Sequence, residues 1–307
     1  MSLRFRKLHP LFAAEVTGVD LRKVEDQPTL NEIRVAMDEY GLLVFPGQEF
    51  TDAEQSEFAR RFDPGDESRA GSDGGEYGES GARSGRAVSE IERRLALDLV
   101  KVSNLDDSSK IVEANDPRRV SKLGNRMWHT DGSIVNPSGR YTMLSGRVIP
   151  PVRADTQFAD TRGAYDALDD ETKAAIDKLT VHYSLVYARH LMGFVFSPEE
   201  EKALPGAVHP LVRINPHTAR RSLYLGQHAS RVIEMPIPEG RLLLGDLTEH
   251  ATQREFVYSH EWRQYDFLIW DNRATLHRAR PFDDSKYGRD MRRTVTRDIG
   301  SPIVATA

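Results

Sequence analysis

The sequence predicts an α+β protein, mainly β, with a double-stranded β-helix (jelly-roll) core decorated by helices. Short apolar, strand-like segments separated by turn residues recur through the 307 residues, and helical segments lie between some of them. This rhythm shows no internal repeat and is typical of strands that close into a barrel. A chain of this length can bury most of its apolar surface, so we expect residues 1–307 to form a single domain.

The first sixty residues alternate strands and helices. The stretch FAAEVTGVDLRK is typical of a strand with a turn, and the apolar run from Gly41 to Gly47 is typical of a buried strand. A helix is expected between them, from about Thr29 to Glu39. Thr51 and Glu54 have the spacing of a capping box, so a second helix should follow in AEQSEFARRF.

Further elements are expected along the rest of the chain. Strands are predicted in RYTMLSGRVIPP, VHYSLVYA, REFVYSHEW, YDFLIWDN and MRRTVTRDI, and a strand leading into a helix in ADTQFADTRGAYDAL. Helices are predicted in DDETKAAIDKL and EGRLLLGDLTEHATQ.

One segment differs in composition from the rest. From Asp63 to Arg86 the chain consists mostly of Gly, Ser, Asp, Glu and Arg and has almost nothing to bury. A flexible linker or loop is one interpretation. A mobile lid over a site is the other, because long structureless loops inside compact domains often serve a function.

Composition restricts the kind of partner. The chain has no cysteine, which excludes disulfides and thiolate chemistry and suits a reducing cytoplasm. The N-terminus MSLRFRKLHP lacks the apolar core of a signal peptide, and no run reaches the length of a membrane span. A net charge of -5 offers no reason to expect nucleic-acid binding. We therefore expect a cytoplasmic protein, without nucleic-acid or membrane partners, that binds a small molecule.

The most informative motif is MWHTDGSI, in which His129 and Asp131 lie two residues apart. On a strand, residues i and i+2 share a face, so this pair could grip one metal ion. His277, in IWDNRATLHRARP, would supply the third ligand. Two imidazoles and one carboxylate form the facial triad of non-haem Fe(II). The alternative is that these are structural histidines satisfied by hydrogen bonds.

The C-terminal strand carries a second candidate feature. Period-two alternation predicts that Arg293, Val295 and Arg297 share one face. A solvated barrel exterior is one interpretation of this face. If it points inward, its two buried guanidinium groups require anions, and a guanidinium binds a carboxylate through two hydrogen bonds. An inward face would therefore predict two anionic ligands.

These motifs together resemble a known family. The chain contains HTD, the threonine of ADTQ, WDN followed by a histidine, and RRxxxR. This set of motifs resembles that of the TauD/TfdA-type dioxygenases, which use Fe(II) and 2-oxoglutarate. The resemblance runs from HPLFAAEVTGVDLR to RRTVTRD. RYTMLS, AYDAL and EHATQREFVY most resemble the 2,4-dichlorophenoxyacetate (aryloxyalkanoate) branch.

The resemblance implies roles for five residues around the metal. His129, Asp131 and His277 would hold Fe(II). Thr156 and Arg293 would bind the cosubstrate 2-oxoglutarate, with Arg293 at its distal carboxylate. Dioxygen would bind at a remaining metal position.

The resemblance also implies a substrate site. Arg297 falls where the family binds the anionic group of its substrate, and Asn125 falls at a substrate-contacting position. Tyr187 is a further candidate for the pocket wall, with a core aromatic residue as the alternative. The stretch from Asp63 to Arg86 is longer than the family leads us to expect, so it bears on specificity.

The implied reaction is hydroxylation of a small anionic substrate, with release of succinate and CO2. An aryloxyalkanoate would be cleaved to a phenol and a keto acid. Asp131 argues against halogenation, because halogenating relatives have a small residue there to admit chloride. The alternatives are a sulfonate or alkyl sulfate dioxygenase, a zinc hydrolase, and a non-catalytic metal-binding barrel. The family also leads us to expect a homo-oligomer.

Overall fold

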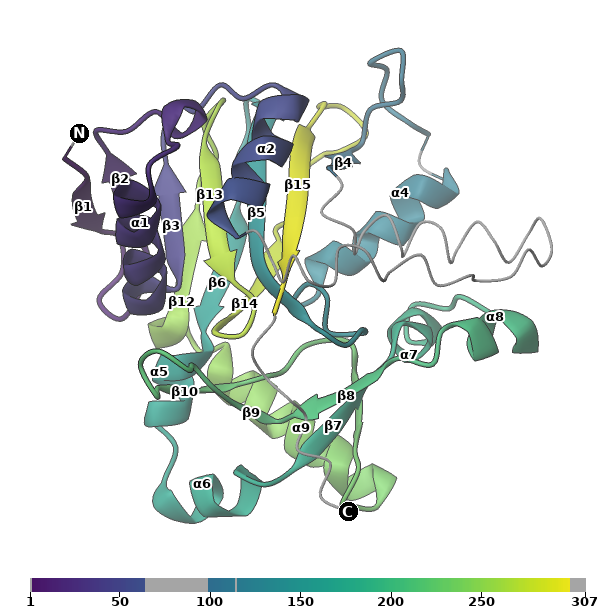
Figure 1. The fold of residues 1–307 in the computed structure, drawn as a ribbon. Coiled ribbons are helices and arrows are strands. Elements are labelled where there is room, and N and C mark those ends of the chain that lie inside the picture. The colour runs from purple at the N-terminus through teal and green to yellow at the C-terminus, as the bar shows by residue number, and fades with distance from the viewer. Residues whose placement is uncertain (1, 64–98, 114, 299–307) are drawn as a thin grey trace.

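A seven-stranded mixed sheet forms the upper part of the molecule in Figure 1. The structure is a computed structural model that describes residues 2–63, 99–113 and 115–298. Of the strand pairs in this sheet, β2 and β3 are parallel and the others are antiparallel. In spatial order its strands are β1 (Arg4–Lys7), β2 (Ala14–Thr17), β3 (Leu42–Phe45), β13 (Phe267–Asp271), β5 (Gly139–Val148), β15 (Asp290–Arg297) and β4 (Val100–Ser103).

Three smaller sheets complete the described β structure. One contains β12 (Val257–His260), β6 (Thr156–Asp160) and β14 (Thr275–Ala279). Another contains β11 (Ala229–Val232), β7 (Thr180–Tyr183) and β8 (Ala207–Pro210). The third pairs β10 (Arg221–Leu223) with β9 (Val212–Ile214).

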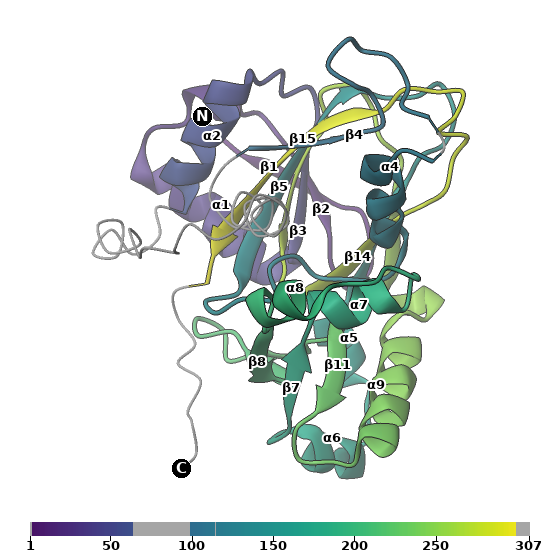
Figure 2. The ribbon, with the colours of Figure 1, turned by 90° about the vertical axis from the view of Figure 1, so that its right-hand side faces the viewer.

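Helices cover the sheets on several sides (Figures 1 and 2). The α-helices are α1 (Gln27–Tyr40), α2 (Asp52–Phe62), α4 (Pro117–Lys122), α5 (Thr161–Asp166), α6 (Asp170–Ile176), α7 (Leu185–His190), α8 (Pro198–Ala203) and α9 (Ile237–Ala251). Short 3-10 turns lie at η1 (Leu21–Lys23), η3 (Leu123–Arg126) and η4 (Arg254–Phe256). No helix of the described residues is long and apolar enough to cross a membrane.

Local sequence signals explain where the first helices begin and end. The Asp26 side chain accepts a hydrogen bond from the Thr29 backbone N–H at the start of α1, which ends at Gly41 in the left-handed conformation. Thr51 and Glu54 form the predicted capping box at the start of α2. Both predicted helices are therefore confirmed.

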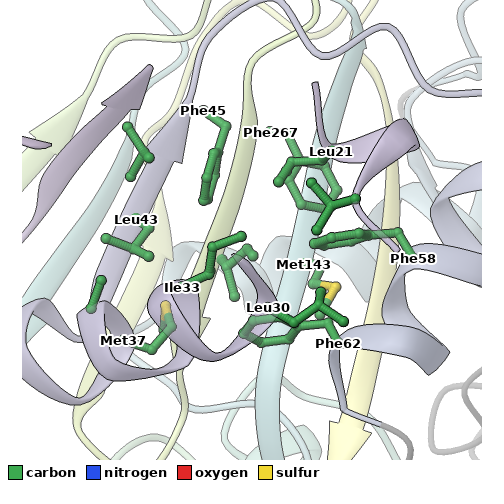
Figure 3. Packing of buried hydrophobic residues seen from close by; sticks show 14 of the residues in the cluster. Leu21, Leu30, Ile33, Met37, Leu43, Phe45, Phe58, Phe62, Met143 and Phe267 are labelled. Carbon is green, nitrogen blue, oxygen red and sulfur yellow. The ribbon is translucent and has the colours of Figure 1, made fainter. Parts of the chain in front are cut away.

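One face of the seven-stranded sheet packs against α1 and α2 through an apolar core (Figure 3). Alternate residues of the central strands, including Met143 and Phe267, lie in this core together with Phe58 and Phe62 of α2. The register pairs Thr142 with Trp270 and Leu144 with Leu268, so these neighbours point to the opposite face. That opposite face carries the candidate site.

The predicted mixture of sheets and helices is confirmed, but two segments differ from expectation. The strand predicted in VHYSLVYA ends at Tyr183, because the Ser184 side chain caps the start of α7. The segment around His129 is not a strand; only an isolated bridge to His277 forms there. Apart from Asp63, the glycine-rich segment predicted at 63–86 lies outside the described residues.

Candidate active site

The two candidate histidines are joined through their backbones. The His129 N–H donates to the His277 carbonyl at 3.0 Å, and the His277 N–H donates back to the His129 carbonyl at 2.8 Å. His277 lies on β14, and the centroids of the two imidazole rings are 4.1 Å apart. The structure therefore brings together two residues that are distant in sequence.

A turn, and not the predicted strand, brings the Asp131 side chain close to the two histidines. Gly132 follows with φ 73°, and a side chain there would meet the Gly139 backbone at 2.5 Å. Only glycine fits this turn. Ligand atoms of Asp131, His129 and His277 all lie within 4.8 Å of one another, and all three residues are buried.

A polar network orients the Asp131 carboxylate. Its Oδ2 accepts a hydrogen bond from Thr142 Oγ1 at 2.9 Å, and its Oδ1 accepts one from Arg293 Nη1 at 2.8 Å. Asn272 Nδ2 donates to the same Thr142 oxygen, and Asn272 Oδ1 accepts from the Asp131 N–H. Partners of this kind orient metal ligands and tune their basicity.

Electrostatics keep the three residues in the form that a metal needs. Burial lowers the pKa of both His129 and His277, so their imidazoles are neutral at neutral pH. Burial tends to raise the pKa of Asp131, but the positive charge of Arg293 and the hydrogen bond from Thr142 help to hold that pKa well below its usual range. Metal ligands must be neutral imidazoles and ionised carboxylates, so the protonation states fit.

The hydrogen-bond contacts of the two histidine rings also suit metal binding. His129 Nδ1 lies 2.8 Å from the Met127 carbonyl, which leaves Nε2 for a metal. His277 Nε2 lies 3.6 Å from Asp131 Oδ2, so this nitrogen faces the other two ligands. With two imidazoles and one carboxylate, the site suits non-haem Fe(II) and leaves positions for other ligands.

Two of the three candidate ligands, His129 and Asp131, line a pocket, which we call the metal pocket. Apolar side chains of Ile134, Leu185 and Val295 form part of its wall. Arg189 and Arg293 bring positive charge. The pocket therefore has apolar surface and cationic groups beside the candidate metal.

A second pocket lies beside it, which we call the basic pocket. Asn125 lines both pockets. The basic pocket also contains Arg289 and Ala279, the latter two residues beyond His277 on β14. Asn125 is thus the residue at which the two pockets meet.

Thr156 lies beside Arg289 and not beside Arg293. Thr156 Oγ1 accepts from Trp262 Nε1 at 2.9 Å and lies 3.4 Å from Arg289 Nη2. Burial lowers the pKa of Arg289 to about 10, so it remains charged at neutral pH, and its buried Nε has no hydrogen-bond partner among the described residues. The predicted grouping of Thr156 with Arg293 is therefore corrected.

The sequence analysis did not single out Arg289, although the sequence contains a signal for it. Arg289 precedes Arg293 by four residues, so the alternation that grouped Arg293 with Arg297 groups Arg289 with Arg293 equally well. Three further residues of the metal pocket, Arg189, Gln227 and His228, had no recognisable motif.

Two predicted substrate residues lie away from the metal pocket. Arg297 is exposed, and the pairing of β15 with β5 shifts register between Val295 and Arg297, so the predicted alternation fails there. Tyr187 packs against Arg241, with the guanidinium carbon 4.8 Å from the ring centroid. Neither side chain lines the metal pocket, whereas Asn125 does.

Comparison with known proteins identifies relatives along almost the whole chain. The sequence model of the family described as "Taurine catabolism dioxygenase TauD, TfdA family" matches residues 4–295. The alpha-ketoglutarate-dependent 2,4-dichlorophenoxyacetate dioxygenase of Cupriavidus pinatubonensis is 38% identical over 97% of this chain and 99% of that protein. The (S)-phenoxypropionate/alpha-ketoglutarate-dioxygenase of Sphingobium herbicidovorans is 33% identical over 90% of this chain and 88% of that protein.

A solved structure extends this similarity to the fold. The crystal structure of AAD-2 in complex with Mn(II) and N-oxalylglycine has a TM-score of 0.84 and 39% sequence identity to this chain. The match covers 99% of both chains.

Proposed function

The chain belongs to the TauD/TfdA dioxygenase family, and on that premise we propose that it is an Fe(II)- and 2-oxoglutarate-dependent dioxygenase that hydroxylates an aryloxyalkanoate. Family membership confirms the resemblance inferred from the motifs. Fe(II) held by His129, Asp131 and His277 supplies oxygen activation, coupling the oxidation of 2-oxoglutarate to succinate and CO2 with hydroxylation of the substrate. The observation that carries the proposal is the metal triad, of which His129 and Asp131 line a pocket that meets a second pocket at Asn125, with arginines in both pockets.

The cosubstrate occupies the basic pocket in this proposal. Arg289 and Thr156 hold its distal carboxylate, which revises the role first predicted for Arg293. The buried Nε of Arg289 supports this assignment, because an unpaired donor in a buried guanidinium offers a strong hydrogen bond to a carboxylate. The complex of AAD-2 with N-oxalylglycine supports 2-oxoglutarate as the cosubstrate, since that compound differs from 2-oxoglutarate only by an NH in place of a CH2.

The primary substrate occupies the metal pocket. Arg293 takes the anionic group that was first predicted for Arg297, and Asn125 lies at the junction with the cosubstrate. Ile134 and Leu185 pack against the aromatic ring. With its carboxylate anchored, the substrate presents the adjacent carbon to the metal, and this positioning selects the C–H bond that reacts.

The products follow from the carbon that is hydroxylated. The reactive carbon lies between an ether oxygen and a carboxylate, so hydroxylation gives a hemiacetal. The hemiacetal collapses to a phenol and a keto acid.

The proposal extends to architecture. The seven-stranded sheet and the β12-β6-β14 sheet form the two walls of a double-stranded β-helix core, since strands of both contribute residues beside the metal. The described chain forms one catalytic domain. Cytoplasmic location and homo-oligomeric assembly stay predictions.

The decisive experiment measures coupled turnover. Purified protein with Fe(II) and 2-oxoglutarate should consume oxygen and release succinate and a phenol from aryloxyacetates or from one enantiomer of an aryloxypropionate. Taurine and an alkyl sulfate serve as competing substrates. Phenol release without 2-oxoglutarate, or with zinc in place of iron, would reject the proposal in favour of hydrolysis.

A pair of variants separates the two arginines. Arg289→Lys should raise the KM for 2-oxoglutarate, and Arg293→Lys should raise the KM for the aryloxyalkanoate. The expected change is roughly tenfold to a hundredfold, because each charged hydrogen bond contributes about 1.5–3 kcal/mol and lysine lacks the planar fork. A raised KM for 2-oxoglutarate in Arg293→Lys, with Arg289→Lys unchanged, would restore the role first predicted for Arg293.

A further inference from the structure

Positive charge is distributed unequally between the two pockets. Arginine and lysine side chains of α4, η3 and the segment after β14 line the basic pocket, and among the described residues Asp284 is the one carboxylate beside them. Those cations are Arg119, Lys122, Arg126, Arg280 and Arg289, an excess of four positive charges. The described lining of the metal pocket has two arginines and the Asp131 carboxylate, which gives an excess of one positive charge because its histidines are neutral.

The charged residues of the basic pocket are held in place by the structure. Asp284 accepts hydrogen bonds from Arg119 at 2.7 Å and from Arg126 at 3.1 Å. These bonds hold the two guanidinium groups close together in the pocket lining although their charges repel. Lys122 Nζ donates to the Ser103 carbonyl. Arg280 lies on the same lining with its side chain exposed to solvent. Positive charge therefore extends from the surface at Arg280 to the partly buried Arg289.

We propose that the basic pocket is a separate access route for the cosubstrate, which guides the 2-oxoglutarate dianion from solvent to Arg289 while the primary substrate reaches the metal through the other pocket. The inference rests on the proposed function. A cleft lined by charges of one sign focuses the field and raises the rate at which an oppositely charged ligand arrives. A dianion is attracted twice as strongly as the monoanionic aryloxyalkanoate.

Two routes have a consequence for the order of binding. Because the cosubstrate does not pass through the metal pocket, a bound primary substrate does not block its arrival. The association rate of 2-oxoglutarate should therefore be nearly the same with and without the aryloxyalkanoate.

The test uses Arg280→Glu, because Arg280 is exposed and is not one of the two residues, Arg289 and Thr156, that hold the cosubstrate in the proposed function. Tryptophan fluorescence in a stopped-flow experiment reports the arrival of 2-oxoglutarate on the Fe(II) protein without oxygen, since Trp262 donates to Thr156. At low ionic strength the association rate constant should fall about threefold to tenfold, with the dissociation rate unchanged. Salt at about 0.5 M should remove the difference, because it screens exposed charges within a few ångström.

Arg254→Glu is the matched control. Arg254 is also exposed, lies in η4 outside both pockets, and gives the same change in net charge. It should leave the association rate at the wild-type value, and Arg280→Gln should give an intermediate rate. If Arg254→Glu lowers the association rate as much as Arg280→Glu does, 2-oxoglutarate does not enter through the basic pocket. An unchanged association rate in Arg280→Glu at low salt would have the same meaning.

Failure of the route and failure of the proposed function give different results. If the wild-type protein neither binds nor consumes 2-oxoglutarate, the proposed function fails and the route fails with it. If the wild type binds and consumes 2-oxoglutarate normally while Arg280→Glu associates at the same rate, only the route is overturned.

Discussion

The two faces of the seven-stranded sheet are built from alternate residues of the same strands, yet they serve different ends. The face toward α1 and α2 is an apolar core in which aromatic rings pack closely, such as Phe58 with Phe267 at 5.8 Å between centroids. On the other face, Thr142 and Arg293 hold the Asp131 carboxylate. One face stabilises the protein, and the other orients a reactive centre.

The difference lies in how specific each contact is. An apolar contact requires suitable size and shape and has no required direction, so many residues satisfy it. A buried hydrogen bond requires a donor and an acceptor at one distance and angle, and an unmet partner is costly. Substitutions on the two faces should therefore have separable effects on stability and on chemistry.

The largest expected effect is the loss of chemistry on the polar face. Asp131→Ala removes the only carboxylate of the triad, so turnover dependent on 2-oxoglutarate should fall by at least about a thousandfold. This loss is larger than the loss of activity expected when a residue that hydrogen-bonds to a metal ligand is removed. Circular dichroism should show an unchanged fold. Asp246→Ala, at an exposed position, is the control and should be fully active. Substantial turnover in Asp131→Ala would contradict the triad.

The converse effect is expected on the apolar face. Phe58→Ala should lower the free energy of unfolding by about 3–5 kcal/mol, because it leaves a cavity among Phe50, Phe62 and Phe267. Urea denaturation measures this change. The folded fraction should bind metal with unchanged affinity, and weakened binding would show that the two faces are coupled.

Buried polar groups should also make stability depend on pH. Burial, assisted by Arg213, lowers the pKa of His209 to about 4. In the unfolded chain its pKa is about 6.5, so below that pH the unfolded state takes up a proton that the folded state does not. The free energy of unfolding should fall by up to about 3 kcal/mol between pH 6.5 and pH 4.

His209→Gln tests this dependence, because glutamine can still donate to the Val135 carbonyl as His209 Nε2 does. Urea denaturation of this variant at several pH values should give a shallower dependence than the wild type. Phe58→Ala should lower stability equally at every pH. Identical slopes for the wild type and His209→Gln would assign the pH dependence to other groups.

The smallest of these effects concerns the support of the metal ligand. Thr142→Val removes the hydroxyl that donates to Asp131 and accepts from Asn272, so metal affinity should fall about tenfold to a hundredfold. Titration with Co(II), followed by its visible absorption, measures the affinity. Thr142→Ser keeps the hydroxyl and should restore most of it. Equal affinities of the valine and serine variants would argue against the role of this hydrogen bond.

Much of the architecture and the metal triad could be predicted because their signals are local. Capping at Thr51 and alternation along β5 and β15 depend on neighbours within a few residues. The triad was predicted from residue type and spacing, although the assumed strand at His129 was wrong and a turn brings Asp131 into position. The chemistry of the donor set was thus a stronger guide than its local conformation.

The sequence by itself predicted the family and the three candidate metal ligands, because residue type, spacing and motifs carry that information directly. Only the tertiary structure decided which residue each arginine lies beside. Arg289 lies at Thr156, and Arg293 lies at Asp131. A shift in strand register leaves Arg297 in solvent. Alternation predicts the side of a strand, but a bulge and the packing of distant segments decide what a side chain meets.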